Sequence, residues 1–281
     1  MHKNTSSKVV LITGALSGVG RFVAERLMKE GYRVYGTSRK LESGREDAYS
    51  WTASKGKGSF RLVPMDINVP ESVRKAVAHV MDREGRIDIL INNAGIVTAG
   101  SVEDTTTEEA SRQFETNFFG THRMCREVLP IMRAQKQGQI ITISSMAAIL
   151  PLPFQSMYCA SKSALESMTE AMRMEVRPYG IRVSLIEPGD MATGNTAGRI
   201  FAAASADSIY SLRFTRAMAV VAKDEQGGPE PTSVAGVVSR LAKRRNPPVR
   251  VATAGFQYKL FKLLCRILPD RFILWIIERM Y

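Results

Sequence analysis

The chain has 281 residues, of which 44% are hydrophobic and 23% are charged, a composition typical of a globular protein with a sizeable core. Its three cysteines are far apart and lack metal-ligand spacing, and no run of 18 apolar residues occurs, so we expect a cytoplasmic protein without a bound metal or a membrane-spanning helix. The net charge is +12, but no basic motif of a nucleic-acid reader occurs, which favours a solvated basic surface over a nucleic-acid partner.

Short apolar runs alternate with helical patterns along most of the chain. Six runs rich in Val and Ile are predicted strands, and most are apolar on both faces, as strands covered on both sides require. They span residues 8–14, 33–38, 60–67, 87–95, 138–145 and 181–189. The alternation predicts an α/β class protein with a single-domain Rossmann fold, in which helices cover both faces of a doubly wound parallel sheet.

Helices are predicted between these strands. The segment 20–31 places Phe22, Val23, Leu27 and Met28 on one stripe and ends at a glycine. A second helix is predicted at 70–85, and a third at 233–245 before a last strand at 249–255. The segment 190–231 is less periodic and ends in DEQGGPEPT, which is typical of a mobile loop.

A glycine-rich turn follows the first predicted strand. Gly14, Gly18 and Gly20 have the spacing G-x-x-x-G-x-G between a strand and an amphipathic helix. Glycines there allow a tight turn and close approach of a pyrophosphate, and the helix N-terminus attracts the anion. The turn therefore predicts a dinucleotide site, although a loop without a ligand would have the same glycines.

The end of the second predicted strand indicates which dinucleotide binds. NAD sites often carry an acidic residue there, whereas this chain has Thr37, Ser38, Arg39 and Lys40. The Arg39 guanidinium can grip a 2′-phosphate and Ser38 can donate a further hydrogen bond, which predicts NADP(H). The alternative for Arg39 is an ordinary exposed charge.

Six motifs resemble the short-chain dehydrogenase/reductase family in their order and spacing. They are TGALSGVG (13–20), NNAG (92–95), NFFG (117–120), ISS (143–145), YCASK (158–162) and EPG (187–189). The resemblance implies a catalytic tetrad of Asn117, Ser145, Tyr158 and Lys162, with Ser145 chosen over Ser144 because of the family spacing.

The same resemblance implies further contacts with the cofactor. Asp66 and Ile67 would lie beside the adenine, Asn93, Ala94 and Gly95 near its ribose, and Thr193 at the nicotinamide carboxamide. The remaining implied contacts are Ser17, Val19, Tyr158, Lys162, Pro188 and Gly189.

The Tyr158–Lys162 pair suits the reduction of a ketone, although a Tyr and a Lys one turn apart also occur on solvated helix faces. Hydride transfer to a ketone needs a proton donor at the carbonyl oxygen, and a free tyrosine with a pKa of about 10 is a poor acid–base group at neutral pH. We expect the Lys162 ammonium and an oxidised nicotinamide to lower the Tyr158 pKa, and Ser145 to hydrogen-bond the substrate oxygen. Asn117 is expected to hold a water that links Lys162 to solvent.

The resemblance also implies that the segment 190–231 covers the substrate. Its apolar side chains are expected to form one pocket wall, although simple packing onto the body of the protein is the alternative, and those of 151–157 are expected to form a second wall. The first set is Phe201, Ile209, Tyr210, Leu212 and Phe214, and the second is Pro151, Leu152, Pro153, Phe154 and Met157. The substrate is then a hydrophobic ketone or secondary alcohol, such as a steroid, retinoid, lipid or polyketide-like molecule. The alternatives are a 3-oxoacyl-thioester reductase and a non-catalytic NADP-binding sensor or scaffold.

The last residues form an extension beyond the predicted domain of residues 1–255. The segment 256–281 is predicted to form two amphipathic helices separated at Pro269, with Lys259, Lys262 and Arg266 on one face of the first. Such helices can lie on anionic lipid as a peripheral membrane contact, but we favour a pocket or dimer contact. The extension resembles the hydroxysteroid-dehydrogenase-like branch of the family, and family habit implies a homodimer or homotetramer.

Overall fold

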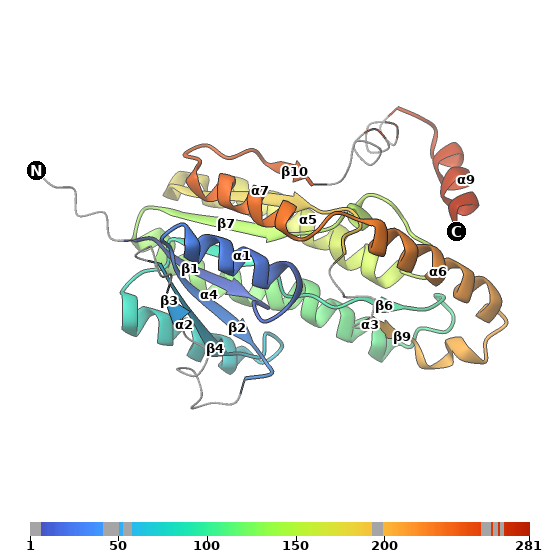
Figure 1. Ribbon diagram of the computed structural model, residues 1–281, viewed down its shortest axis with the longest axis horizontal. Helices are drawn as coiled ribbons and strands as arrows, with labels where there is room; N and C mark the ends of the chain where they lie inside the picture. Colours follow the sequence, from blue (N-terminus) through green and yellow to red (C-terminus); the bar gives the residue numbers. More distant parts are fainter. Residues whose placement is uncertain are drawn as a thin grey trace, which may run out of the picture.

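The computed structural model describes residues 7–41, 51–52, 58–192, 199–253, 260, 264 and 267–281. Eight strands in this part of the chain form one sheet (Figure 1). They are β1 (Val9–Thr13), β2 (Arg33–Ser38), β3 (Trp51–Thr52), β4 (Ser59–Pro64), β5 (Ile89–Asn92), β7 (Gly138–Ile143), β8 (Ile181–Glu187) and β10 (Arg250–Ala252). The order is β10-β8-β7-β5-β1-β2-β4-β3, and every pair is parallel except β3 with β4.

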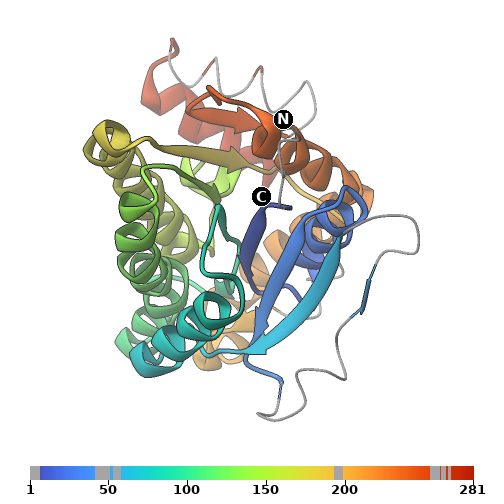
Figure 2. The same cartoon turned by 90° about the vertical axis from the view of Figure 1, so that its left-hand side faces the viewer.

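Helices cover both faces of this sheet, as the alternation of strands and helices predicts. The helices of the described residues are α1 (Gly18–Lys29), α2 (Pro70–Glu84), α3 (Thr107–Phe114), α4 (Gly120–Ala134), α5 (Ser156–Val176), α6 (Ser211–Gly227), α7 (Thr232–Lys243) and α9 (Asp270–Met280). Val10 and Ile12 of β1 pack with α1 and α7, whereas Val9 and Leu11 pack with α2, α4 and α5 on the other face. Figure 2 shows the two layers of helices on either side of the strands. The predicted doubly wound α/β fold is confirmed.

The order of the strands determines where a ligand can bind. From β1 the chain adds β2 and β4 on one side, then returns to add β5, β7, β8 and β10 on the other. In open parallel sheets of this kind, a crevice forms at the carboxyl ends of the strands where the direction reverses. The loops after β1 and β5 meet at that crevice.

Two local predictions need correction. Phe22 is 38% exposed and does not belong to the buried stripe of α1, which consists of Gly20, Val23, Ala24, Leu27 and Met28. The segment predicted to be a mobile loop contains the C-terminal turn of the 17-residue helix α6. That helix was missed because it buries only Ala217, Met218 and Val221, which is a narrow apolar stripe.

The C-terminal extension is described in part. The first helix predicted there, including Lys259, Lys262 and Arg266, lies largely outside the described residues. The second is present as α9, which begins directly after Pro269 and turns Ile273 and Ile277 inward. In the described part of the chain, no helix combines the length and apolarity needed to cross a bilayer.

Candidate active site

The turn between β1 and α1 has the geometry of an anion cradle. Gly14 and Gly18 have φ values of 68° and 53°, in the left-handed region that favours glycine. Ser17 is the extended residue before α1, its hydroxyl makes no capping bond, and the first turn of α1 carries no acidic residue. Asn93 Nδ2 donates to the carbonyl oxygens of Thr13 at 2.9 Å and Gly14 at 3.0 Å, which fixes the turn.

Gly20 contributes to this turn through packing and not through a contact with the nucleotide. It is buried and does not line the cavity described below. A Cβ at Gly20 would lie 2.2 Å from the Gly14 carbonyl oxygen and 2.5 Å from Asn93 Nδ2. Gly20 therefore lets α1 pack directly against the turn, and the prediction that it contacts the cofactor is replaced by a packing role.

A cavity of about 1250 Å³ runs from this turn across the carboxyl ends of the strands to α6 and α9. It brings together nearly all of the residues predicted to bind the cofactor or to react. The predicted residues on its wall are Gly14, Ser17, Gly18, Val19, Ser38, Arg39, Asp66, Ile67, Asn93, Ala94, Gly95, Ser145, Tyr158, Lys162, Pro188 and Gly189. Thr193 lies outside the described residues.

The chemistry of this wall fits a phosphorylated dinucleotide. The loop after β2 carries Ser38, Arg39 and Lys40, and the Ser38 hydroxyl accepts a hydrogen bond from the Lys40 amide at 3.2 Å. No carboxylate stands at these positions to repel a 2′-phosphate. The carboxylate of Asp66, the nearest acidic residue after β4, accepts the Asn68 amide at 2.9 Å and so caps its own turn.

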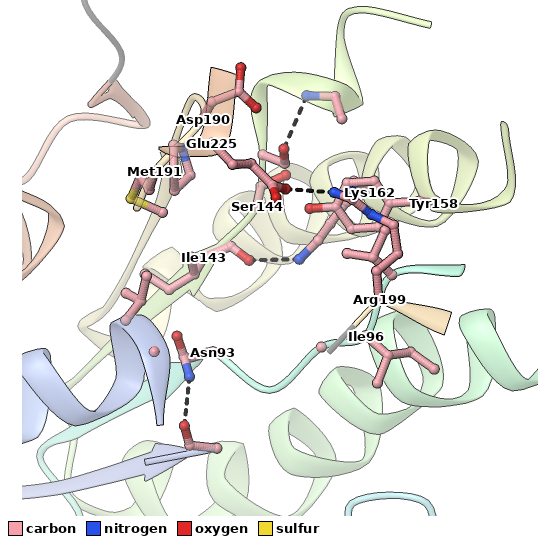
Figure 3. A pocket seen from close by; sticks show the side chains of 18 of the residues that line it. Asn93, Ile96, Ile143, Ser144, Tyr158, Lys162, Asp190, Met191, Arg199 and Glu225 are labelled. Carbon is pink, nitrogen blue, oxygen red and sulfur yellow. Dashed lines mark hydrogen bonds and ion pairs between the residues drawn. The ribbon is translucent and has the colours of Figure 1, made fainter. Parts of the chain in front are cut away.

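Tyr158 and Lys162 project from the first turns of α5 into the cavity (Figure 3). Ser145, two residues after the end of β7, lines the same cavity. The Ser145 hydroxyl hydrogen-bonds Tyr158 and also accepts the Ala147 amide at 3.1 Å. Ser144 is buried beside Glu166 instead. The geometry thus supports Ser145 as the predicted partner of the tyrosine.

The Tyr158 pKa differs from the expectation drawn from the sequence. Burial raises the pKa of Tyr158 to about 12, while the hydrogen bond from Ser145 and the charge of Arg199 oppose the rise. The Lys162 ammonium lies 5.9 Å from the centroid of the tyrosine ring and donates to the Ile143 carbonyl oxygen at 3.1 Å. Burial therefore sets the direction of the pKa shift in the protein alone, where the phenol keeps its proton at neutral pH. The expected lowering of the Tyr158 pKa by an oxidised nicotinamide stays a prediction.

A buried ionic network lies behind Lys162. Burial lowers the pKa of Lys162 to about 8, and the charge of Glu166, one turn further along α5, opposes this change. Arg250 of β10 binds the carboxylates of Glu166, Glu170 and Glu187. The network holds α5 against β8 and β10, and within it the Glu166 carboxylate favours the charged form of Lys162.

Asn117 lies in a π-helical turn, Glu115–Phe119, just outside the cavity. Its Nδ2 donates to the Ile96 carbonyl oxygen at 3.0 Å and to Ser161 Oγ at 3.1 Å, and its Oδ1 accepts the Ile96 amide at 2.8 Å. Asn117 thus connects the loop after β5 to α5. Its role in a water relay to Lys162 stays a prediction.

The predicted substrate walls are largely wrong. Phe201, Ile209 and Leu212 are 53%, 89% and 63% exposed, and none of the five residues proposed for the first wall lines the cavity. Of the second set, Leu152 alone does. Apolar composition identified these segments, but it does not indicate which of their side chains face inward.

Helices α6 and α9 supply the walls that the sequence did not reveal. Val221 of α6 and Ile277, Met280 and Tyr281 at the C-terminal end close the side of the cavity that faces Tyr158. The charged residues Asp190, Arg199, Lys223, Asp224 and Glu225 also line it. Nothing local in the sequence marks these residues, because they meet only through the packing of distant segments.

The family model that matches residues 8–201 is described as short chain dehydrogenase. A 3-ketodihydrosphingosine reductase of Bacteroides thetaiotaomicron is 38% identical over 98% of both chains. An NADPH-dependent 3-dehydrocapnine reductase of Ornithobacterium rhinotracheale is 29% identical over 95% of this chain and 94% of that protein. The crystal structure of a short-chain dehydrogenase from Streptomyces avermitilis superposes with a TM-score of 0.76, at 31% identity over 98% of this chain and 97% of that one. The chain belongs to the short-chain dehydrogenase/reductase family, oxidoreductases that act on ketones and alcohols with a nicotinamide dinucleotide.

Proposed function

We propose that this protein is an NADP(H)-dependent reductase of the ketone group in long-chain, lipid-like molecules, with 3-ketodihydrosphingosine as the first candidate. The observation that supports this proposal most strongly is that Tyr158 lines one cavity together with the glycine turn and with Val221, Ile277 and Met280 of α6 and α9. The similarity to the 3-ketodihydrosphingosine reductase, which extends over 98% of both chains, supports the lipid class.

The preference for NADP(H) rests on the loop after β2. Arg39 and Lys40 line the groove together with Ser38. The loop lacks the acidic side chain that would accept hydrogen bonds from the ribose hydroxyls of NAD. The printed name of the 3-dehydrocapnine reductase, which specifies NADPH, supports the same assignment.

The residues on the wall have distinct tasks in this reaction. The bound dinucleotide supplies the hydride. The protonated Tyr158 hydroxyl donates its proton to the carbonyl oxygen, and the Ser145 hydroxyl stabilises the charge that develops on that oxygen. Lys162, held by Ile143, stabilises the phenolate that remains until a proton returns from solvent.

The narrower predictions fit this function without being needed for it. Membership of the hydroxysteroid-dehydrogenase-like branch, a homodimer or homotetramer, and peripheral membrane contact stay predictions. So do the absence of a nucleic-acid partner and the division into a domain of residues 1–255, a lid at 190–231 and an extension at 256–281.

The function is tested by following NADPH consumption with a panel of ketones. We expect 3-ketodihydrosphingosine and other long-chain 3-ketones to be reduced with a higher kcat/KM than a 3-oxoacyl thioester, a steroid ketone or a short ketone of the same head group. Reduction of the thioester alone would instead identify a 3-oxoacyl-thioester reductase. Nucleotide binding without turnover of any ketone would contradict an enzymatic role.

Arg39→Ala is expected to raise the KM for NADPH about tenfold or more and to change the KM for NADH little. The variant loses a charged hydrogen bond to the 2′-phosphate, and such bonds contribute about 1.5–3 kcal/mol. Initial rates with both nucleotides measure the effect. Arg74→Ala, which removes an exposed arginine paired with Glu71 on α2, is the control. An unchanged nucleotide preference in Arg39→Ala would remove this residue from the assignment.

A further inference from the structure

A buried ion pair lines the part of the cavity between α6 and α9, where apolar and charged side chains both form the wall. Arg199 donates from a terminal guanidinium nitrogen to Glu225 of α6 at 2.5 Å, and its side chain is only 4% exposed. Figure 3 shows both side chains beside Tyr158. Among the described residues, Arg199 Nε has no hydrogen-bond partner although it is buried.

The Arg199 guanidinium is close enough to Tyr158 for its positive charge to affect the pKa of the phenol. Its charge opposes the rise in pKa that burial causes at Tyr158 and at Tyr281, both of which line the same cavity. A buried charged pair is costly unless each polar atom has a partner, and an unpartnered N–H in a cavity wall is a position for an acceptor. Neither the nucleotide groove nor the proton transfer uses this donor.

We propose that Arg199 and Glu225 form a subsite for a polar head group carried next to the ketone of the lipid substrate. The Arg199 Nε–H binds a hydroxyl or other oxygen of the head group, and Glu225 holds the guanidinium in place. This inference rests on the proposed function. It adds that the preferred lipid substrate carries a polar group at the end near the ketone. A plain long-chain ketone leaves the buried donor without a partner and is selected against.

The test compares two matched ketones, 1-hydroxydodecan-3-one and dodecan-3-one, which differ only in the hydroxyl. Wild-type protein is expected to prefer the hydroxylated ketone in kcat/KM. Arg199→Met, which keeps an unbranched chain as far as the position of Nε but removes the guanidinium donor, is expected to reduce this preference at least about tenfold. Arg216→Met, the same change at an exposed position of α6, should keep the wild-type ratio.

Calorimetric binding of the corresponding alcohols in the presence of NADP⁺ gives a second readout that does not depend on turnover. Arg199→Met should weaken binding of dodecane-1,3-diol at least about tenfold more than binding of dodecan-3-ol. An equal loss for both ligands in rate and binding would show that Arg199 only supports the structure, and no loss for either would show that it is idle. Both results overturn the subsite. Failure of the proposed function gives a different result: wild-type protein then reduces neither ketone. The binding comparison would still show whether Arg199 recognises the hydroxyl.

Discussion

Tyr158→Phe is expected to lower kcat for ketone reduction by about 10² to 10⁴-fold, the usual contribution of a positioned proton donor. The ring that faces Lys162 stays in place, but the hydroxyl that hydrogen-bonds Ser145 and would protonate the carbonyl oxygen is lost. Steady-state rates with NADPH and a long-chain 3-ketone measure the effect. Direct NADPH binding, followed by the fluorescence of the nucleotide, should change little because the phosphate cradle is elsewhere.

Tyr179→Phe is the matched control for this variant. Tyr179 is 49% exposed after α5 and lies away from the cavity, so removal of its hydroxyl should leave the rate as in wild type. A Tyr158→Phe protein with near-normal kcat would show that another group protonates the substrate. Equal losses of rate and of nucleotide binding would show that the variant damages the groove, so the two measurements together separate chemistry from folding.

The fold and the nucleotide end of the site could be predicted because their signals are local. The first strand, VVLIT, is buried at every position and apolar at the first four because helices cover both of its faces, and the glycine turn follows it directly. Tyr158 and Lys162 lie on the same side of α5 because one helical turn separates them. Patterns within one strand, one turn or one turn of helix are fixed by backbone geometry, so they can be predicted without knowledge of tertiary contacts.

The substrate end could not be predicted because its parts meet only in the folded chain. The pairing of Arg199 with Glu225 depends on how α6 lies across the carboxyl ends of the strands, and the contribution of Tyr281 depends on where α9 docks. The direction of the Tyr158 pKa shift has the same origin. Spacing suggested a lysine that lowers this pKa, whereas burial, a property of the packed protein, raises it.

The same distinction applies to the glycines of the first turn. The sequence marks Gly14, Gly18 and Gly20 as equivalent, but the structure separates two that shape the turn from one that lets the helix approach it. A side chain at Gly20 meets backbone and the amide of Asn93, neither of which can yield without moving the turn. This position therefore links the packing of α1 to the nucleotide site.

Gly20→Ala is expected to lower the free energy of unfolding by about 1–3 kcal/mol, as overpacking of a filled interior does. The added Cβ would push α1 away from Gly14 and break the hydrogen bonds that Asn93 makes to the turn, so NADPH binding should weaken at least about tenfold as well. Urea denaturation and nucleotide titration measure the two effects. Gly236→Ala is the control, because a Cβ there would meet only the end of Arg240, at 3.9 Å, and the better helix former should stabilise α7 by about 0.5–1 kcal/mol. A Gly20→Ala protein with wild-type nucleotide affinity would show that the cradle does not depend on the close contact between α1 and the turn.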